Sequence, residues 1–220
     1  MGQLNKISTI VENREATIGI IGLGYVGLPL AIRFSEEGFS VLGFDIDQSK
    51  VDLLNKGKSY IKHINHKKIN KIVSKGFSAT ANFKKISKAD VVIICVPTPL
   101  GTHNEPDLSY IDNTLKLIKN HLKKYQLLIL ESTTYPGTTE EILVPFIEST
   151  TIKAHTKQQM SKVLIGKNFF VGYSPEREDP GNKDYSTKTI PKVVSGVTKN
   201  CLNLTKTVYD QIVDKTVPVK

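Results

Sequence analysis

The chain has 220 residues, of which 39% are hydrophobic and 23% are charged, a composition typical of a soluble folded protein. No apolar run is long enough to cross a bilayer, and the polar segment Met1 to Glu15 lacks a signal-peptide core, so we expect no membrane association. The two cysteines have no paired spacing, which argues against a disulfide framework and favours a cytoplasmic location. The formal charge is +9, but the lysines are interpreted as spread along the chain rather than gathered on one element, so we expect attraction to anionic nucleotides or simple solubility rather than nucleic-acid binding.

The first predicted strand, Thr17–Gly22, runs into a glycine-rich turn and then an amphipathic helix. Gly22 permits a tight turn, Gly24 lets backbone N–H groups approach a diphosphate, and Gly27 lets the helix pack close to the sheet. A second strand, Ser40–Asp45, ends in an acid. Strand, glycine turn, helix, strand and acid in this order predict a dinucleotide site.

Asp45 is placed to accept hydrogen bonds from the adenosine ribose hydroxyls and to repel a 2′-phosphate. Because Ile46 rather than an arginine follows it, we expect NAD rather than NADP. Lys50 either flanks the ribose or pyrophosphate or is a solvated helix lysine. Tyr25 and Val26 lie inside the glycine turn and are expected to contact the cofactor through their backbone.

Strands and helices continue to alternate, which predicts an α/β fold with a doubly wound parallel sheet, a Rossmann-like NAD-binding domain. Further strands are expected at Phe77–Thr80, Asp90–Val96, Leu127–Ser132, Phe169–Tyr173 and Lys192–Ser195, and further helices at Gln48–Asn55, Lys67–Ser74, Ser109–Lys124, Thr138–Glu148 and Thr198–Val213. Ser149–Lys167 is polar and is expected to be a long loop or insert. Residues 1–15 are assigned to an N-terminal extension, 16–216 to the NAD-binding domain and 217–220 to the start of a linker.

Ligands of open parallel sheets bind beyond the carboxyl ends of the strands. There the sequence places Pro97 and Thr98 after one strand, Thr133 after the next, and Glu176 after a third. These residues are therefore candidates for the cofactor site and its chemistry, although Thr98 could be only a turn hydroxyl and Glu176 only a surface acid. No metal site is expected, because His63 and His66 have no third ligand at suitable spacing.

The chain resembles the N-terminal domain of the UDP-glucose/GDP-mannose dehydrogenases. The resemblance spans nearly the whole chain and rests on Gly22–Leu30, the Asp45 segment, Cys95-Val96-Pro97-Thr98-Pro99, Glu131-Ser132-Thr133 with Gly137-Thr138-Thr139, and Ser174-Pro175-Glu176. Three segments look most like the UDP-N-acetylglucosamine 6-dehydrogenase branch: Gly57-Lys58-Ser59-Tyr60-Ile61, Ser174–Asn182 and Ile190–Gly196. UDP-glucose dehydrogenases have an Asn-Pro-Glu-Phe-Leu type of loop that this chain lacks, which puts UDP-glucose in doubt as the substrate.

This resemblance implies a two-step, NAD-dependent oxidation of a UDP-N-acetylhexosamine to its uronate, with UDP-N-acetylmannosamine and UDP-glucose as alternative substrates. It implies that Thr133 orients a catalytic water, that Glu176 acts as a base or assists thioester hydrolysis, and that Thr98 lines the nicotinamide half of the site. The family forms a covalent intermediate on a cysteine that follows two glycines. The family's usual assembly is a homodimer.

The family's cysteine, and an active-site lysine and asparagine, belong to segments C-terminal to those matched here. Cys95 lies in an apolar strand and Cys201 has no preceding glycine pair, so neither is expected to replace the nucleophile. We therefore expect a cofactor-binding fragment that binds NAD but does not oxidise a UDP-sugar, the C-terminal domain being absent from the chain. Two alternatives stay open: a β-hydroxyacid-type dehydrogenase, and a non-catalytic NAD-binding module that works through a partner.

Overall fold

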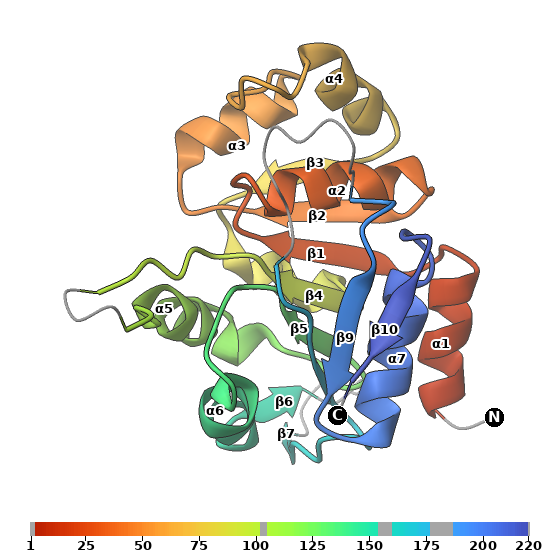
Figure 1. Ribbon diagram of the computed structural model, residues 1–220, viewed down its shortest axis with the longest axis vertical. Coiled ribbons are helices and arrows are strands. Elements are labelled where there is room, and N and C mark those ends of the chain that lie inside the picture. Colours follow the sequence, from red (N-terminus) through yellow and green to blue (C-terminus); the bar gives the residue numbers. More distant parts are fainter. Residues whose placement is uncertain (1–2, 102–104, 154–159, 177–186, 220) are drawn as a thin grey trace.

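The computed structural model describes residues 3–101, 105–153, 160–176 and 187–219. They form one mixed, mostly parallel sheet of eight strands in the order β3-β2-β1-β4-β5-β8-β9-β10, together with a separate two-stranded sheet (Figure 1). The first five positions, β3-β2-β1-β4-β5, follow the strand order of dinucleotide-binding folds, so the predicted fold class is confirmed.

The strands are β1 (Thr17–Ile21), β2 (Ser40–Phe44), β3 (Ser78–Thr80), β4 (Val91–Ile94), β5 (Leu127–Leu130), β6 (Thr151–Lys153), β7 (Met160–Lys162), β8 (Phe170–Tyr173), β9 (Lys192–Gly196) and β10 (Thr216–Pro218). The α-helices are α1 (Gln3–Glu12), α2 (Gly27–Glu36), α3 (Gln48–Asn55), α4 (His66–Ser74), α5 (Ser109–Ile118), α6 (Val144–Glu148) and α7 (Lys199–Tyr209). Two short 3₁₀ helices, η1 (Phe83–Lys88) and η2 (Lys119–His121), and one π-helical turn, η3 (Thr139–Leu143), complete the set.

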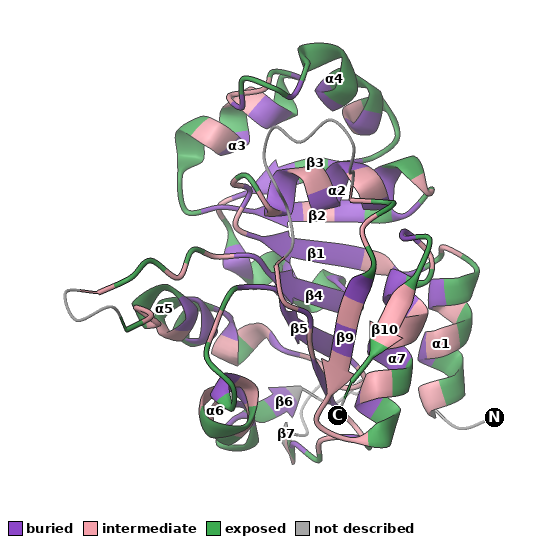
Figure 2. Ribbon diagram, viewed as in Figure 1, coloured by how far each residue is buried: buried purple, intermediate pink, exposed green. Residues whose placement is uncertain are grey.

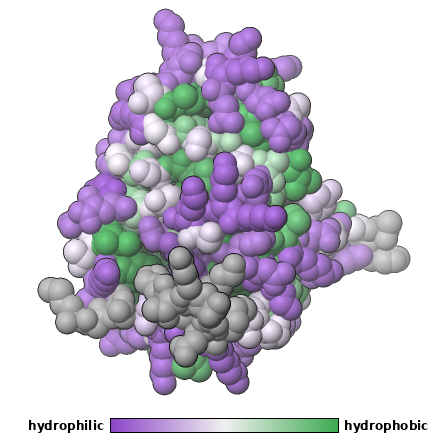
Figure 3. Space-filling view, turned by 180° about the vertical axis from the view of Figure 1, so that it is seen from behind, coloured by the Kyte–Doolittle hydropathy of each residue, from purple (hydrophilic) through white to green (hydrophobic). Residues whose placement is uncertain are grey.

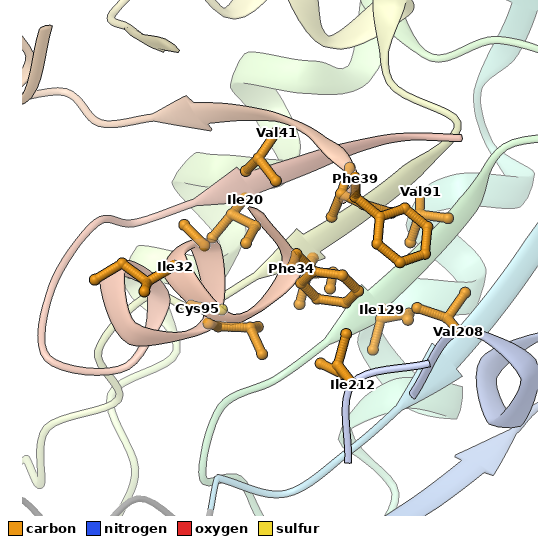
Figure 4. Packing of buried hydrophobic residues seen from close by; sticks show 14 of the residues in the cluster. Ile20, Ile32, Phe34, Phe39, Val41, Val91, Cys95, Ile129, Val208 and Ile212 are labelled. Carbon is orange, nitrogen blue, oxygen red and sulfur yellow. The ribbon is translucent and has the colours of Figure 1, made fainter. Parts of the chain in front are cut away.

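Helices cover both faces of the sheet, which explains why its central strands are apolar without alternation. In β4, Val91 and Ile93 belong to the core layer under α1, α2 and α7, whereas Val92 and Ile94 belong to the layer under α5 and α6. Figure 2 shows the central strands buried along their length, with exposed residues on the outer sides of the helices. Figure 4 shows Phe34 of α2 packed in the first layer with Ile129 of the sheet.

Two expectations about the second half of the chain were wrong. The strand Lys192–Gly196 pairs antiparallel with β8, so the sheet is not parallel throughout. The segment Ser149–Lys167 is not simply a loop, because β6 and β7 pair antiparallel and Ile152 and Val163 are buried in the second core layer. The polar composition of this segment hid the two buried side chains.

Both ends of the described chain are attached to the domain. The segment assigned to an N-terminal extension forms α1, whose Ile7 and Val11 are buried against the layer that contains α7. Val217 and Pro218, assigned to a linker, lie in β10, which pairs parallel with β9. No helix of the described residues is long and apolar enough to cross a membrane.

Candidate functional site

The glycine turn between β1 and α2 has the geometry that its sequence predicts. Gly22 has a φ of +88°, and a Cβ there would lie 2.7 Å from the carbonyl oxygen of Cys95. A Cβ on Gly27 would lie 1.9 Å from the carbonyl oxygen of Gly22, so only glycine allows α2 to start this close to the strand. Gly24 is different, because a Cβ there would meet no atom within 4 Å. The open space above Gly24, directly before the N-terminus of α2, makes a suitable cradle for a phosphate.

Asp45 is buried at the end of β2, with 7% of its surface exposed, and is connected to the glycine turn. Its Oδ2 accepts a hydrogen bond from the backbone N–H of Leu23 at 3.0 Å, and its Oδ1 accepts one from Asp47 at 3.0 Å. Ile46 beside it is 75% exposed and supplies no charge for a ribose phosphate. The carboxylate therefore retains lone pairs for the hydroxyls of an unphosphorylated ribose.

Tyr60 is a site residue that our sequence reasoning did not identify. Its hydroxyl donates a hydrogen bond to the carbonyl oxygen of Leu23, and its ring lies 5.7 Å from the Nζ of Lys50. The same Nζ is 4.0 Å from Oδ2 of Asp45. Burial, and then the negative charges of Asp45 and Asp47, raise the pKa of Tyr60, so its hydroxyl keeps its proton and donates. The signal was present in the Gly57–Ile61 segment, which carries part of the family resemblance.

The next residues on the same segment hold the turn at a second point. The ring of His63 stacks on Tyr25 with centroids 5.9 Å apart, and the Nδ1 of His66 accepts a hydrogen bond from the backbone of Ser59 at 2.8 Å. No group of three potential metal ligands occurs among the residues that the structure describes. His63 and His66 each have a partner within the protein, Tyr25 and Ser59 respectively.

At the other end of the site, the loop after β5 is fixed by hydrogen bonds from neighbouring strands. Thr98 donates to the carbonyl oxygen of Thr133 at 2.5 Å, and Ser132 donates to that of Val96 at 2.8 Å. The hydroxyl of Tyr173 donates to the carbonyl oxygen of Ser132 at 3.3 Å. These bonds leave the Thr133 side chain exposed at the site while its backbone is held.

Beneath this loop lies a buried ionic cluster formed by Glu131, Lys192 and Tyr209. One carboxylate oxygen of Glu131 is bound by the Nζ of Lys192 and the other by the hydroxyl of Tyr209. Burial alone would lower the pKa of Lys192, but the ion pair with Glu131 outweighs it and the pKa is raised. Burial and the nearby Glu131 also raise the pKa of Tyr209. The cluster joins the residue after β5 to β9 and α7, which are distant in sequence, and sequence reasoning gave no signal for it.

These parts surround one cleft of about 730 Å³. Every residue predicted for the site lines it except Gly27, which packs behind the turn: Gly22, Gly24, Tyr25, Val26, Asp45, Lys50, Pro97, Thr98, Thr133 and Glu176. Phe83 and four residues of α5, including Tyr110 and Leu117, were not predicted but also line it. Of the Ser174–Asn182 segment, residues 177–182 lie outside the described part of the chain.

Both cysteines of the chain are buried, which was expected for Cys95 from its apolar strand. Burial, followed by the charges of Glu131 and Glu176, raises the pKa of the Cys95 thiol well above its usual value. The sulfur of Cys201 accepts hydrogen bonds from the backbone of Val171 at 3.4 Å and from Thr198 at 3.2 Å. Neither thiol has the exposed environment of a nucleophile.

Comparison with known proteins agrees with this geometry. The chain is 39% identical over 196 residues to protein CapL of Staphylococcus aureus, covering 89% of this chain and 43% of that protein. It is 36% identical over 200 residues to a UDP-N-acetyl-D-glucosamine 6-dehydrogenase of Pseudomonas aeruginosa, covering 91% of this chain and 44% of that protein. Among solved structures, the UDP-N-acetyl-mannosamine dehydrogenase Cap5O of S. aureus matches with a TM-score of 0.80 and 30% identity, over 93% of this chain and 47% of that one.

The chain thus spans less than half the length of these relatives. The model of the NAD-binding domain of the UDP-glucose/GDP-mannose dehydrogenases matches residues 16–213, a range that contains every predicted site residue. NAD is the cofactor of this domain, and the chain belongs to the UDP-glucose/GDP-mannose dehydrogenase family.

Proposed function

We propose that this chain is the cofactor-binding part of a nucleotide-sugar 6-dehydrogenase that oxidises a UDP-N-acetylhexosamine to the corresponding uronate. The observation that carries the proposal is the cleft itself. It combines a phosphate cradle at Gly24, a ribose acceptor at Asp45, and Thr133 with Glu176 at its far end. The names of the relatives support an N-acetylhexosamine as the sugar, because they include UDP-N-acetylglucosamine and UDP-N-acetylmannosamine dehydrogenases.

Each end of the cleft has a distinct proposed task. The N–H groups at Gly24, Tyr25 and Val26 bind the diphosphate, while Asp45 binds the adenosine ribose with Lys50 beside it. NAD supplies the hydride acceptor for the oxidation of an alcohol when it is bound.

Pro97 and Thr98 line the nicotinamide half of the cleft. Thr133 orients a water molecule, for which its held backbone and exposed side chain are suited. Glu176 takes up a proton or assists the hydrolysis of a thioester. Because both thiols of this chain are buried, we also propose that the chain alone does not oxidise the sugar.

Two glycine substitutions test the cofactor site. Gly24→Ala adds a methyl group where the fold has open space but the diphosphate is proposed to lie, so NAD affinity should fall by at least about tenfold with no loss of stability. Gly76→Ala also meets no atom within 4 Å but lies outside the cleft at a φ of +100°. It should cost about 1–2 kcal/mol of stability and leave NAD binding unchanged.

Isothermal titration calorimetry with NAD and urea unfolding measure the two effects separately. Unchanged NAD affinity in Gly24→Ala would refute the proposed diphosphate position. Sustained NADH production from UDP-N-acetylglucosamine by the wild-type chain alone would refute the proposed inactivity.

A further inference from the structure

The positive charge of this chain is concentrated in one segment. Residues 53–89 contain ten lysines and no aspartate or glutamate, whereas the other 183 residues contain 20 lysines and arginines against 21 acids. The segment therefore has a net charge of +10 and the rest of the chain a net charge of −1, which together give the formal charge of +9. Its lysines occupy several elements, from the end of α3 through α4 to η1. The expectation that the lysines are spread along the chain was therefore wrong, because it considered single elements and not the acid-free segment that joins them.

All ten lysines are exposed: Lys56, Lys58, Lys62, Lys67, Lys68, Lys71, Lys75, Lys84, Lys85 and Lys88. None of them lies within 4.0 Å of a carboxylate in the part of the chain that the structure describes, so no ion pair there neutralises them. Figure 3 shows hydrophilic residues at the tip of the molecule where α4 lies in Figure 1, with hydrophobic patches between them. The helix α4 packs in the first core layer and η1 in the second, so these lysines lie on both sides of this edge of the sheet; we call the segment the basic cap (residues 53–89).

The basic cap adjoins the cleft. Tyr60, Ile61 and Phe83 belong to the cap by sequence and line the cleft wall, close to Lys50 and Asp45. The cap therefore borders the half of the cleft that is proposed to take the adenosine and diphosphate. Field lines from charges beside a cleft raise the local concentration of oppositely charged ligands and the rate at which they associate.

We propose that the basic cap is an electrostatic funnel that accelerates association of the anionic dinucleotide with its cleft. This inference rests on the proposed cofactor site and adds a task for lysines that do not line it. NADH carries two phosphate charges, and NAD⁺ carries the same two charges together with a positive nicotinamide ring. The cap should therefore accelerate NADH more than NAD⁺.

An anionic membrane is a less suitable partner for the cap. A helix that binds a lipid surface needs a free apolar face as well as lysines. In α4 the apolar residues Ile69 and Ile72 are fully buried in the protein core, so the helix has no such face to insert. A small, freely diffusing anion fits a surface that offers charge alone.

Stopped-flow fluorescence of NADH binding to the wild-type chain and two variants tests the funnel. The cap variant replaces four exposed lysines of α4 and its C-terminal turn by glutamine: Lys67, Lys68, Lys71 and Lys75. The control variant makes the same change in charge at four exposed lysines outside the cap: Lys6, Lys162, Lys167 and Lys199. None of these eight residues lines the cleft.

In roughly 0.01 M salt, where the screening length is about 30 Å, the association rate of NADH should fall roughly 3–10-fold in the cap variant and less than about twofold in the control. In roughly 1 M salt, where the screening length is about 3 Å, the three proteins should associate at the same rate. The dissociation rate should change little, because the site itself is intact.

Equal association rates in the two variants at low salt would overturn the funnel. The funnel would also be overturned if the wild-type chain co-sedimented with phosphatidylserine vesicles, the cap variant did not, and the two proteins had the same NADH kinetics. A wild-type chain that binds no NADH at any salt concentration would overturn the proposed cofactor site itself. Normal NADH affinity of the wild-type chain, with equal association rates in the two variants, would overturn the funnel alone.

Discussion

Lys192→Met should destabilise the fold by about 3–5 kcal/mol, because it leaves a buried carboxylate with one of its two partners. The side chain of Glu131 is 2% exposed and that of Lys192 is 7% exposed, so the carboxylate loses its main partner in a largely buried place. Tyr209 would remain the single donor to Glu131. In urea, a loss of this size moves the unfolding midpoint down by roughly 1–2 M.

Two controls separate the buried charge from simple loss of a side chain. Lys206→Met breaks the exposed ion pair with Asp210 on α7 and should cost less than about 1 kcal/mol. Adding Glu131→Gln to Lys192→Met removes the uncompensated charge and should recover roughly 1–3 kcal/mol. If Lys192→Met and Lys206→Met were equally stable, the cluster would not be an ion pair isolated from water.

Three further results are expected. Asp45→Asn should weaken NAD binding by roughly 10–100-fold in calorimetry and reduce the preference for NAD over NADP, because it removes a charged acceptor. An unaltered preference for NAD would contradict the proposed role of Asp45. Tyr60→Phe should weaken NAD binding by roughly 3–10-fold while binding of nicotinamide mononucleotide stays the same, because only the adenosine side loses the bond to Leu23. Because burial raises the pKa values of Cys95 and Tyr209, the free energy of unfolding that depends on these two groups is fully present below pH 9. It falls as the pH rises above their usual pKa values of 9.0 and 10.0, by about 1.4 kcal/mol per pH unit for each group. Urea unfolding between pH 8 and pH 11 should show this decline, and Cys95→Ala should flatten its first part, whereas an identical slope in the variant would exclude the thiol as its source.

The features that were predicted from sequence are those whose cause is local. The conformation of the Gly22 turn and the close approach at Gly27 follow from the absence of a side chain, and no distant residue is needed to specify them. The carboxyl ends of parallel strands meet at one edge, so Asp45, Thr98 and Thr133 could be assigned to one cleft before the structure was known. Local geometry and strand order thus account for most of the predicted site.

The features that were missed depend on contacts between distant segments. Glu131 and Lys192 are 61 residues apart, and nothing in either neighbourhood indicates that they form a pair. The helix α1 is stabilised by burial of Ile7 and Val11 against the domain, which a short polar segment does not reveal by itself. The orientation of β9 was missed for the same reason, because alternation of elements predicts a strand but not its direction.

The backbone of Leu23 is held at two points, its N–H by Asp45 and its carbonyl oxygen by Tyr60. The acid proposed to bind the ribose is consequently connected through Leu23 to the amides proposed to bind the phosphates. A ligand fragment such as AMP that binds to the acid would also restrain the neighbouring amides. The conformational entropy lost in ordering those amides would then not be lost again when the rest of the dinucleotide binds. The two halves of the dinucleotide should accordingly bind with positive cooperativity, because each half orders part of the site of the other.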